Sequence, residues 1–288
     1  MECEVCRMKQ DKTPYLFLFP SVIFVFIILL SPGIYGLWQS FYESYKAEYK
    51  FVGIKNYEAL IKDERFFTNI RLSLTYLLVI PPSIALGYLI AILLTSNLKG
   101  IRFFKTIVIL PFASASIATA YMFRSIVNPV FGPLTIFNDI TGLSINPFSD
   151  ANLAMIVVIL HSIWRSVPFY ALFLAAAIES IPSQIFEQSK IDGAGAWSRF
   201  KNITLPLTLP HMLIATLMVM TWTLGDMEAS YSLFFGGPGR GTEVVAIRLA
   251  REAFFYGNIG LGSAIAVFLI IPCMIFLVIY LRLLRRIE

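Results

Sequence analysis

The segment EQSKIDGAGAWSRFKNITLPLTLP, residues 187–210, interrupts a chain that is otherwise strongly apolar. The segment keeps a helix-compatible pattern, but it is charged up to residue 201, with Glu187, Lys190, Asp192, Arg199 and Lys201. So many charges are too costly to place in hydrocarbon. The segment therefore marks a place where the chain leaves the membrane between two apolar runs.

Composition supports a membrane protein. The chain has 288 residues, of which 57% are hydrophobic and 14% are charged, and its mean hydropathy is +0.74. Soluble domains contain about 25% charged residues. The formal net charge of +5 does not indicate a nucleic-acid partner, because the basic residues flank apolar runs as the positive-inside rule predicts.

Six apolar runs are long enough, or nearly so, to cross the membrane. A spanning helix needs about 20 predominantly apolar residues. The predicted spans cover about residues 15–38, 72–98, 106–124, 151–178, 205–231 and 258–281. Prolines inside these runs are compatible with spanning helices, because neighbouring groups satisfy the freed carbonyls. We expect an all-α integral membrane protein with one transmembrane domain over residues 1–288.

The distribution of Lys and Arg predicts the orientation. With the N-terminus inside, the inner segments are 1–14, 99–105, 179–204 and 282–288, and each contains three basic residues. These twelve cations lie in short segments, whereas ten lie in the longer outer connections. The positive-inside rule then places both termini, and the segment that opened this section, in the cytoplasm.

The segment 179–204, termed the elbow, is predicted to form two short helices separated by a glycine. Pro182 and Ser183 are a suitable helix start, and Gly193 is a suitable stop. A second helix would present residues spaced three apart, namely Trp197, Phe200 and Ile203. Leu205 and Pro206 would then turn the chain into the fifth span. Such an elbow fits a docking surface for a partner equally well as an amphipathic loop on lipid headgroups.

The elbow resembles a motif of a known family. Inner-membrane permease subunits of binding-protein-dependent ABC importers carry an EAA loop, with E-A-A, a glycine and then I-x-L-P at fixed spacing. Here Glu187 is followed by Gly193, Ile203 and Leu205-Pro206 at that spacing, and Gln188-Ser189 replaces the two alanines. In the family this loop is a coupling helix that docks on an ATPase. The resemblance assigns coupling to Glu187, Gln188, Ser189, Asp192, Gly193, Phe200, Ile203, Leu205 and Pro206.

The resemblance extends along nearly the whole chain. YLFLFPSVIFVFIILLSPGIYGLWQSF (15–41) is similar to the first span of the maltose-type "F" subunit, and FVGIKNYEAL (51–60) to its first outer loop. FNDITG (137–142) and FFGGPGRGTEVVAIRLAREAF (234–254) also match segments of that branch. The resemblance implies a type I ABC importer permease fold in the inner (plasma) membrane of a prokaryote. The implied cargo is a carbohydrate of the maltose, trehalose or glycerol-phosphate kind.

The same resemblance implies several partners. They are a second homologous permease subunit, two cytosolic ATPase subunits that bind ATP and Mg²⁺, and an extracytoplasmic sugar-binding protein. The chain itself is expected to hold no cofactor and to be no enzyme, since GGPGRGT (236–242) lacks the lysine of a phosphate-binding loop. A metal site is also not expected, because Cys3 and Cys6 have no second ligand pair. The alternatives are a secondary-active transporter and a membrane-embedded enzyme.

Ionisable residues within the spans indicate where a sugar might pass. Arg165 lies in the fourth predicted span, and Asp226 and Glu228 lie in the fifth. Such residues usually face an aqueous cavity or a partner, and nearby aromatic rings could stack on a sugar, namely Trp164, Tyr170, Trp222 and Tyr231. The alternative is an Arg165–carboxylate pair that only holds helices together. By the rise per residue of a helix, Asp226 lies at a different depth in its predicted span from Arg165, which favours separate roles for these two residues.

Overall fold

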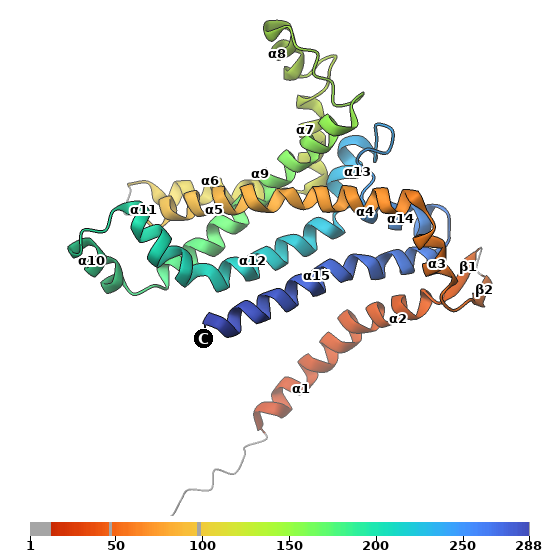
Figure 1. Ribbon diagram of the computed structural model, residues 1–288, viewed down its shortest axis with the longest axis horizontal. Coiled ribbons are helices and arrows are strands. Elements are labelled where there is room, and N and C mark those ends of the chain that lie inside the picture. Colours follow the sequence, from red (N-terminus) through yellow and green to blue (C-terminus); the bar gives the residue numbers. More distant parts are fainter. Residues whose placement is uncertain (1–12, 46–47, 97–98, 288) are drawn as a thin grey trace, which may run out of the picture.

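The computed structural model describes residues 13–45, 48–96 and 99–287. Long helices lie roughly side by side, with the elbow at one end and a small β-hairpin at the other (Figure 1). These two ends are called the elbow end and the hairpin end below. Several residues weighed above lie outside the described residues, namely Cys3, Cys6, Arg7, Lys9, Lys12 and Lys46, as does the predicted end of the second span at residue 98.

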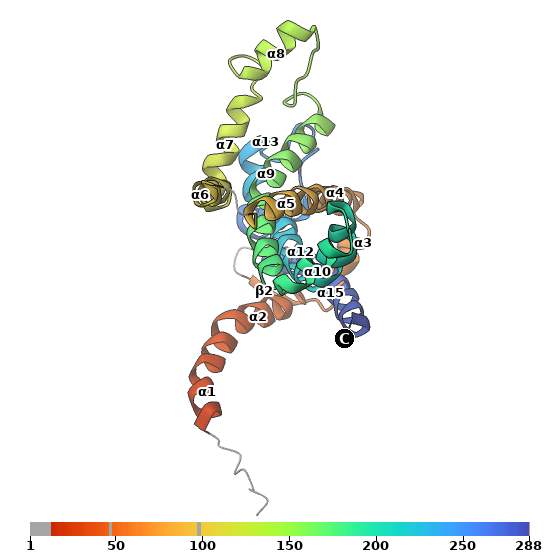
Figure 2. The same ribbon diagram turned by 90° about the vertical axis from the view of Figure 1, so that its left-hand side faces the viewer.

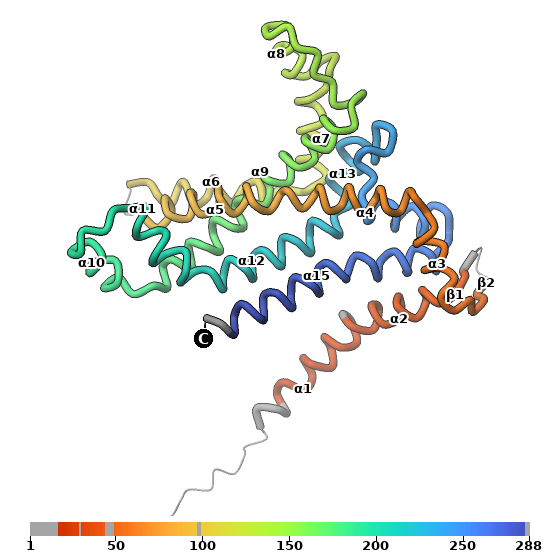
Figure 3. The backbone as a smooth tube through the Cα atoms, viewed as in Figure 1, coloured from red at the N-terminus to blue at the C-terminus, as the bar shows by residue number. Residues whose placement is uncertain are grey.

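The N-terminal helix leads away from the other helices. It consists of α1 (Thr13–Val25), the π-turn η1 (Phe26–Leu30) and α2 (Ser31–Gln39). Its apolar stretch, Phe17–Gln39, is long enough to span a membrane, and none of its most apolar window is buried within the chain. In the tube view α1 projects well clear of the bundle (Figure 3). Most of the described side chains of this helix are therefore exposed, as lipid-facing side chains are.

The next segment forms the hairpin end and the second span. The strands β1 (Tyr42–Tyr45) and β2 (Glu48–Phe51) pair antiparallel, with Tyr42 opposite Phe51. This hairpin is one exception to the all-α prediction. After α3 (Lys55–Ile61), a continuous rod runs from Glu64 to Leu94 through α4 (Glu64–Tyr76), η2 (Leu77–Val79) and α5 (Ile80–Leu94). The helix thus begins eight residues before the predicted start at 72, because Asp63 caps it by accepting a hydrogen bond from the Arg65 amide.

The third predicted span, over about residues 106–124, is not one straight helix. The chain forms α6 (Ile101–Ala113) and α7 (Ser116–Ile126), which are bent by 91° relative to each other. Ser114 and Ala115 both have extended backbone angles, and two such residues in succession end the helical hydrogen-bond pattern. α7 then leads to α8 (Pro133–Thr141), which lies far out on one side of the bundle (Figures 1 and 2).

The remaining helices complete the bundle. α9 (Ala151–Glu179) matches the fourth predicted span, and α10 (Ser183–Ile191) follows it at the elbow end. The chain returns through α11 (Ala196–Arg199), the π-turn η3 (Phe200–Thr204) and α12 (Leu205–Gly225). Two short helices follow, α13 (Glu228–Phe234) and α14 (Val245–Ala250), and the chain then passes through the π-turn η4 (Arg251–Phe255) into the last span, α15 (Ile259–Ile287). Within the described residues, five helices are long and apolar enough to cross a membrane, or six if α6 and α7 count as one bent span.

Two further boundaries differ from the prediction. The chain does not turn at Leu205 and Pro206, because the helix is continuous from Ala196 to Gly225. The Leu205 amide donates a hydrogen bond to the Phe200 carbonyl across the wide π-turn. Pro206 has no backbone N–H group to donate, and the widened turn lets the helix continue past it. The fifth span also ends at Gly225 rather than at residue 231.

The closest helix pairing joins α5 to α9. At Gly87, an added Cβ atom would lie 2.5 Å from the Cβ atom of Tyr170. Small residues let transmembrane helices approach closely and gain dispersion contacts. Here Ala91, Ala171 and Ala175 continue the contact and are at most 5% exposed. α12 packs on the same pair through Ala215 and Val219, and this cluster forms the core at the elbow end.

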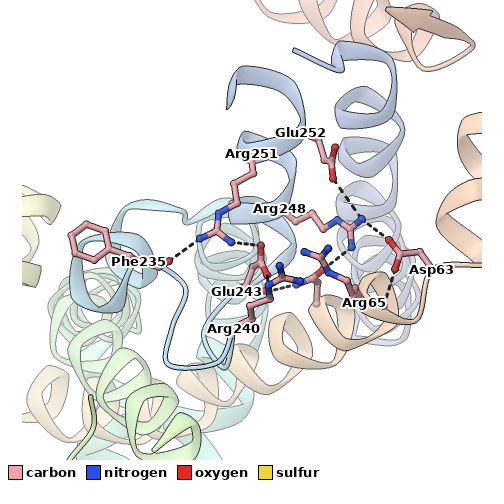
Figure 4. A network of polar contacts seen from close by, with 9 residues as sticks. Asp63, Arg65, Phe235, Arg240, Glu243, Arg248, Arg251 and Glu252 are labelled. Carbon is pink, nitrogen blue, oxygen red and sulfur yellow. Dashed lines mark hydrogen bonds and ion pairs between the residues drawn. The ribbon is translucent and has the colours of Figure 1, made fainter. Parts of the chain in front are cut away.

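Ion pairs hold the hairpin end together, as Figure 4 shows. An Arg248–Asp63 pair at 2.5 Å joins α14 to the start of the rod, and an Arg251–Glu243 pair at 2.5 Å joins η4 to the loop 236–243. Arg251 also donates to the Phe235 carbonyl. Burial disfavours the charge on Asp63, but the hydrogen bonds from Arg248 and the Arg65 amide outweigh it and lower the pKa of this carboxyl below its ordinary value.

We predict that Gly87→Ala destabilises the α5–α9 contact. The new methyl group has no room unless the two helices separate, and overpacking of this kind costs about 1–3 kcal/mol. The thermal unfolding midpoint of the purified chain in detergent should fall. Gly36→Ala in α2 is the matched control, because nothing lies within 4 Å of a Cβ atom added there. Equal midpoints for the two variants would show that the contact is not tight.

Candidate functional site

The elbow is a compact turn at one end of the bundle. α10 begins after Pro182, as the sequence predicted, and it ends at the predicted stop, where Gly193 adopts a φ of 75°. The amide of Ala194 bonds to the Ser189 carbonyl at 2.9 Å, and the Arg199 guanidinium donates to the Ala194 carbonyl at 2.9 Å. A residue with a Cβ atom is strained at this φ. Glycine and these two bonds therefore fix the angle between α10 and α11.

The apolar side chains of the elbow divide into two groups. Phe200 packs inward, with its ring edge-on to Tyr88 at a centroid distance of 5.4 Å, and Leu205 belongs to the same cluster. In contrast, Ile191 is 86% exposed and Trp197 is 73% exposed. The inner contacts attach the elbow to the bundle, whereas the outer side chains are uncovered within this chain.

The other residues predicted for coupling also divide into a buried and an exposed group. Ser189 is buried and donates to the Phe186 carbonyl, and Ile203 is partly buried. The others face outward: Glu187, Gln188, Asp192, Gly193 and Pro206 are exposed. The exposed carboxylates and large apolar groups at the elbow are together termed the elbow surface, which we define by Glu187, Ile191, Asp192 and Trp197.

A cavity of about 630 Å³ lies in the middle of the bundle. Its walls come from α4, α6, α7, α9, α12 and α13. Four of the seven residues predicted for a sugar path line it, namely Arg165, Trp222, Asp226 and Glu228. The cavity therefore brings together one cation, two carboxylates and an aromatic ring.

Arg165 projects from the middle of α9 toward the bend between α6 and α7. One of its terminal nitrogens donates to the Ser116 hydroxyl at 2.6 Å, and Ser116 is the first residue of α7. The Nε atom of Arg165 is buried without a hydrogen-bond partner. Among the described residues no ion pair joins Arg165 to a carboxylate, so the helix-locking pair that the sequence left open is not formed there. Arg165 and Asp226 nevertheless line one cavity.

Asp226 lies where the fifth span breaks. Its backbone is extended after Gly225, and its side chain accepts a hydrogen bond from the Ala229 amide at the start of α13. Aspartate favours such local bonds to the backbone, which compete with helix continuation. The second carboxylate oxygen accepts a hydrogen bond from the Tyr76 hydroxyl at 2.8 Å, and that hydroxyl also contacts Ser162 at 2.5 Å. A carboxylate thus connects α4, α9 and the α12–α13 break.

One aromatic wall of the cavity is formed by Trp222. Its ring packs against Phe169 and Phe112, at centroid distances of 4.9 Å and 6.0 Å. The side chain is 46% exposed, so part of the indole remains open to the cavity. Flat aromatic surfaces of this kind suit the apolar faces of ligands that also need polar contacts.

Three predicted path residues lie elsewhere. Tyr170 is fully buried and donates to Thr216 at 3.3 Å, Trp164 packs near Phe123, and Tyr231 packs against Phe235. Sequence proximity to a charge placed them on the wrong helix face. Conversely, the sequence analysis missed the hydroxyl groups of Tyr76, Ser116, Ser162 and Ser166 in the cavity wall. Of these, only Ser162 had an available signal, because it lies three residues before Arg165 on the same helix face.

Comparison with known proteins now shows the family. Residues 59–288 match the family model for the binding-protein-dependent transport system inner membrane component. The chain belongs to this family. A probable ABC transporter permease protein of Pyrococcus horikoshii is 32% identical over 95% of this chain and 96% of that protein. The trehalose/maltose transport system permease protein MalF of Thermococcus litoralis is 29% identical over 96% of this chain and 95% of that protein.

Solved structures share the fold. A chain of a bacterial alginate ABC transporter, crystallised with its alginate-bound periplasmic protein, superposes with a TM-score of 0.81 at 22% identity, over 97% of this chain and 96% of that one. A chain of the MetNI methionine transporter gives a TM-score of 0.56 at 18% identity, over 77% of this chain and 95% of that one. The predicted type I ABC importer permease fold is confirmed. The chain is a multi-pass transport permease subunit.

We predict that Tyr76→Phe weakens the connection between α4 and the α12–α13 break. The change leaves the Asp226 carboxylate without its tyrosine donor, and losing a hydrogen bond to a charged group costs about 1.5–3 kcal/mol. The thermal unfolding midpoint in detergent should fall. Tyr121→Phe is the control, because that ring is 48% exposed and no hydrogen bond of its hydroxyl is seen within the described part of the chain. An unchanged midpoint for Tyr76→Phe would contradict the assigned contact.

Proposed function

We propose that this chain forms one half of the translocation path of an ATP-driven carbohydrate importer in a prokaryotic inner membrane. The observation that carries the proposal is the mixed cavity, where Arg165, Asp226 and Glu228 face an open volume beside the Trp222 ring. Charged groups are costly at membrane depth unless they serve a cavity or a partner. Sugar hydroxyls both donate and accept hydrogen bonds, so carboxylates and a guanidinium suit them. The sugar permeases among the relatives support the choice of cargo.

The elbow is proposed to couple this path to a pair of cytosolic ATPase subunits. ATP and Mg²⁺ would be bound by those subunits. On this proposal the elbow end and both termini face the cytoplasm, as the charge distribution predicted. The elbow surface supports it, because Ile191 and Trp197 are large apolar groups left uncovered beside the exposed Glu187 and Asp192. A core of apolar contacts with charged neighbours is the usual composition of a protein interface.

The proposed mechanism is a change of state of the permease pair. A second homologous permease subunit completes the path, and an extracytoplasmic binding protein delivers the sugar. ATP binding drives the change only if the ATPases bind the two permease states with different free energies, since equal binding shifts no equilibrium. α9 suits the transmission, because it carries Arg165 at its middle and the elbow follows directly after its end at Glu179.

The alternatives fit the observations less well. A secondary-active transporter has no use for an elbow that presents apolar groups outside the bilayer. A membrane-embedded enzyme needs a catalytic constellation at one interface, and the cavity residues form no nucleophile–base pair. Neither alternative explains why the mixed cavity lies at the middle of α9 while the elbow surface follows directly after its end.

We expect a double change, Ile191→Ser with Trp197→Ala, to abolish capture of the ATPase. Both side chains are exposed, so the fold should be unaffected, whereas hot-spot residues of an interface each contribute about 2 kcal/mol or more. Co-purification of the ATPase with the tagged permease should fall at least tenfold. Ile140→Ser on α8 is the matched control, since Ile140 is 79% exposed and distant from the elbow. Full capture by the double variant would refute the coupling surface.

Uptake of labelled disaccharides by the reconstituted complex tests the path. We expect Asp226→Ala and Glu228→Gln each to reduce uptake about tenfold or more, because a hydrogen bond to a charged group contributes about 1.5–3 kcal/mol. Glu228 is exposed at the start of α13, so its change tests the cavity without disturbing the Tyr76 contact. Glu58→Gln on α3 is the control. Normal uptake with normal assembly in both cavity variants would place the sugar elsewhere.

A further inference from the structure

A second cavity lies at the hairpin end and is surrounded by arginines. It has a volume of about 600 Å³ and lies between α4, the first turns of α9 and the loop 236–243. Arg65, Arg71 and Arg240 line it. Three guanidinium groups around one volume produce a strongly positive potential, which attracts an anion.

The arginines are not neutralised by the chain itself. Within the described residues, neither Arg65 nor Arg71 forms an ion pair, and Arg240 lies 3.8 Å from Glu243. Glu243 is the only carboxylate in the described cavity wall, and it is bound more closely by Arg251, at 2.5 Å. Arg251 offsets this negative charge, so the cavity retains an excess of positive charge.

The depth of the cavity matches the headgroup layer of a membrane. The rod from Glu64 to Leu94 has 31 residues, whereas hydrocarbon is crossed by about 20. Its uncharged run starts at Leu72, directly after Arg71. On the facing wall, Asn152 lies in the first turn of α9. The cavity thus lies at the hairpin-end limits of both apolar runs, next to the level at which lipid phosphates lie.

Exposed apolar side chains continue from the cavity toward the middle of the bundle. On the rod these are Leu74 and Leu78, which are 51% and 59% exposed. On α9 they are Ile156 and Leu160, which are 50% and 53% exposed. Each pair follows a cavity residue at helical spacing, namely Arg71 on the rod and Asn152 on α9. A molecule with an anionic head and apolar chains would contact both the arginines and these stripes.

We propose that this cavity binds the phosphate group of an anionic phospholipid, with the acyl chains along the exposed stripes. Guanidinium groups form paired hydrogen bonds to phosphate oxygens. An anionic headgroup is preferred over a zwitterionic one, because the cavity retains excess positive charge. The bound lipid connects α4, α9 and the loop 236–243. The inference depends on the membrane location of the chain and is independent of the proposed cargo.

Native mass spectrometry of the full-length chain tests the proposal. The probes are phosphatidylglycerol and phosphatidylcholine with identical acyl chains, added to protein in mild detergent. We expect phosphatidylglycerol to be retained at least tenfold more than phosphatidylcholine. Arg65→Gln combined with Arg71→Gln should abolish this preference, and Arg71→Gln alone should reduce it. The control combines Lys55→Gln with Lys62→Gln, which removes the same charge from exposed positions on and beside α3, and it should keep the preference.

Four results would overturn the proposal. The first is equal retention of the two lipids by the unmodified chain. The second is a preference that survives in the arginine variants. The third is complete displacement of the lipid by millimolar inorganic phosphate, which would make the cavity a site for free anions. If the arginine variants instead weaken only the interaction with the binding protein in uptake assays, the occupant is an acidic protein surface and the lipid proposal is wrong. Failure of the sugar-path variants leaves the lipid measurement unaffected, so the two proposals are tested separately.

Discussion

The close contact between α5 and α9 is the constraint on which the rest of the structure depends. Gly87 lies against Tyr170 with no room for a methyl group, and α12 packs on the pair that results. α9 therefore has a fixed position in the bundle. Its middle supplies Arg165 to the cavity, and its end leads directly into the elbow. A force applied at the elbow would reach the cavity through one helix held on two sides.

The cavity lies where helices are broken. α6 and α7 meet at a 91° bend, and α12 stops at Gly225 before α13 begins. Irregular backbone at membrane depth is tolerated only where protein or water satisfies its polar groups. Here Asp226 satisfies the Ala229 amide, and Arg165 contacts Ser116 at the bend. The same breaks that expose polar groups to the cavity are thus stabilised by the residues that line it.

Charge serves different purposes at the two ends of the bundle. At the hairpin end, Arg248 pairs with Asp63 and joins α14 to the rod, whereas Arg251 pairs with Glu243 and joins η4 to the loop 236–243. At the elbow end, Glu187 and Asp192 remain exposed.

The sequence by itself determined the class of protein, most of the spans and the two ends of α10, because hydropathy, proline and glycine act locally along the chain. It also singled out Arg165 and Asp226, since charges in apolar runs are conspicuous. Only the tertiary structure decided that these two residues share a cavity with Tyr76 and Ser162, and that Phe200 faces inward while Trp197 faces outward. The bend at Ser114 and the break at Gly225 were likewise decided there. The direction in which a side chain faces and the position at which a helix breaks depend on contacts between residues far apart in the chain. An apolar run gives no local signal of these contacts.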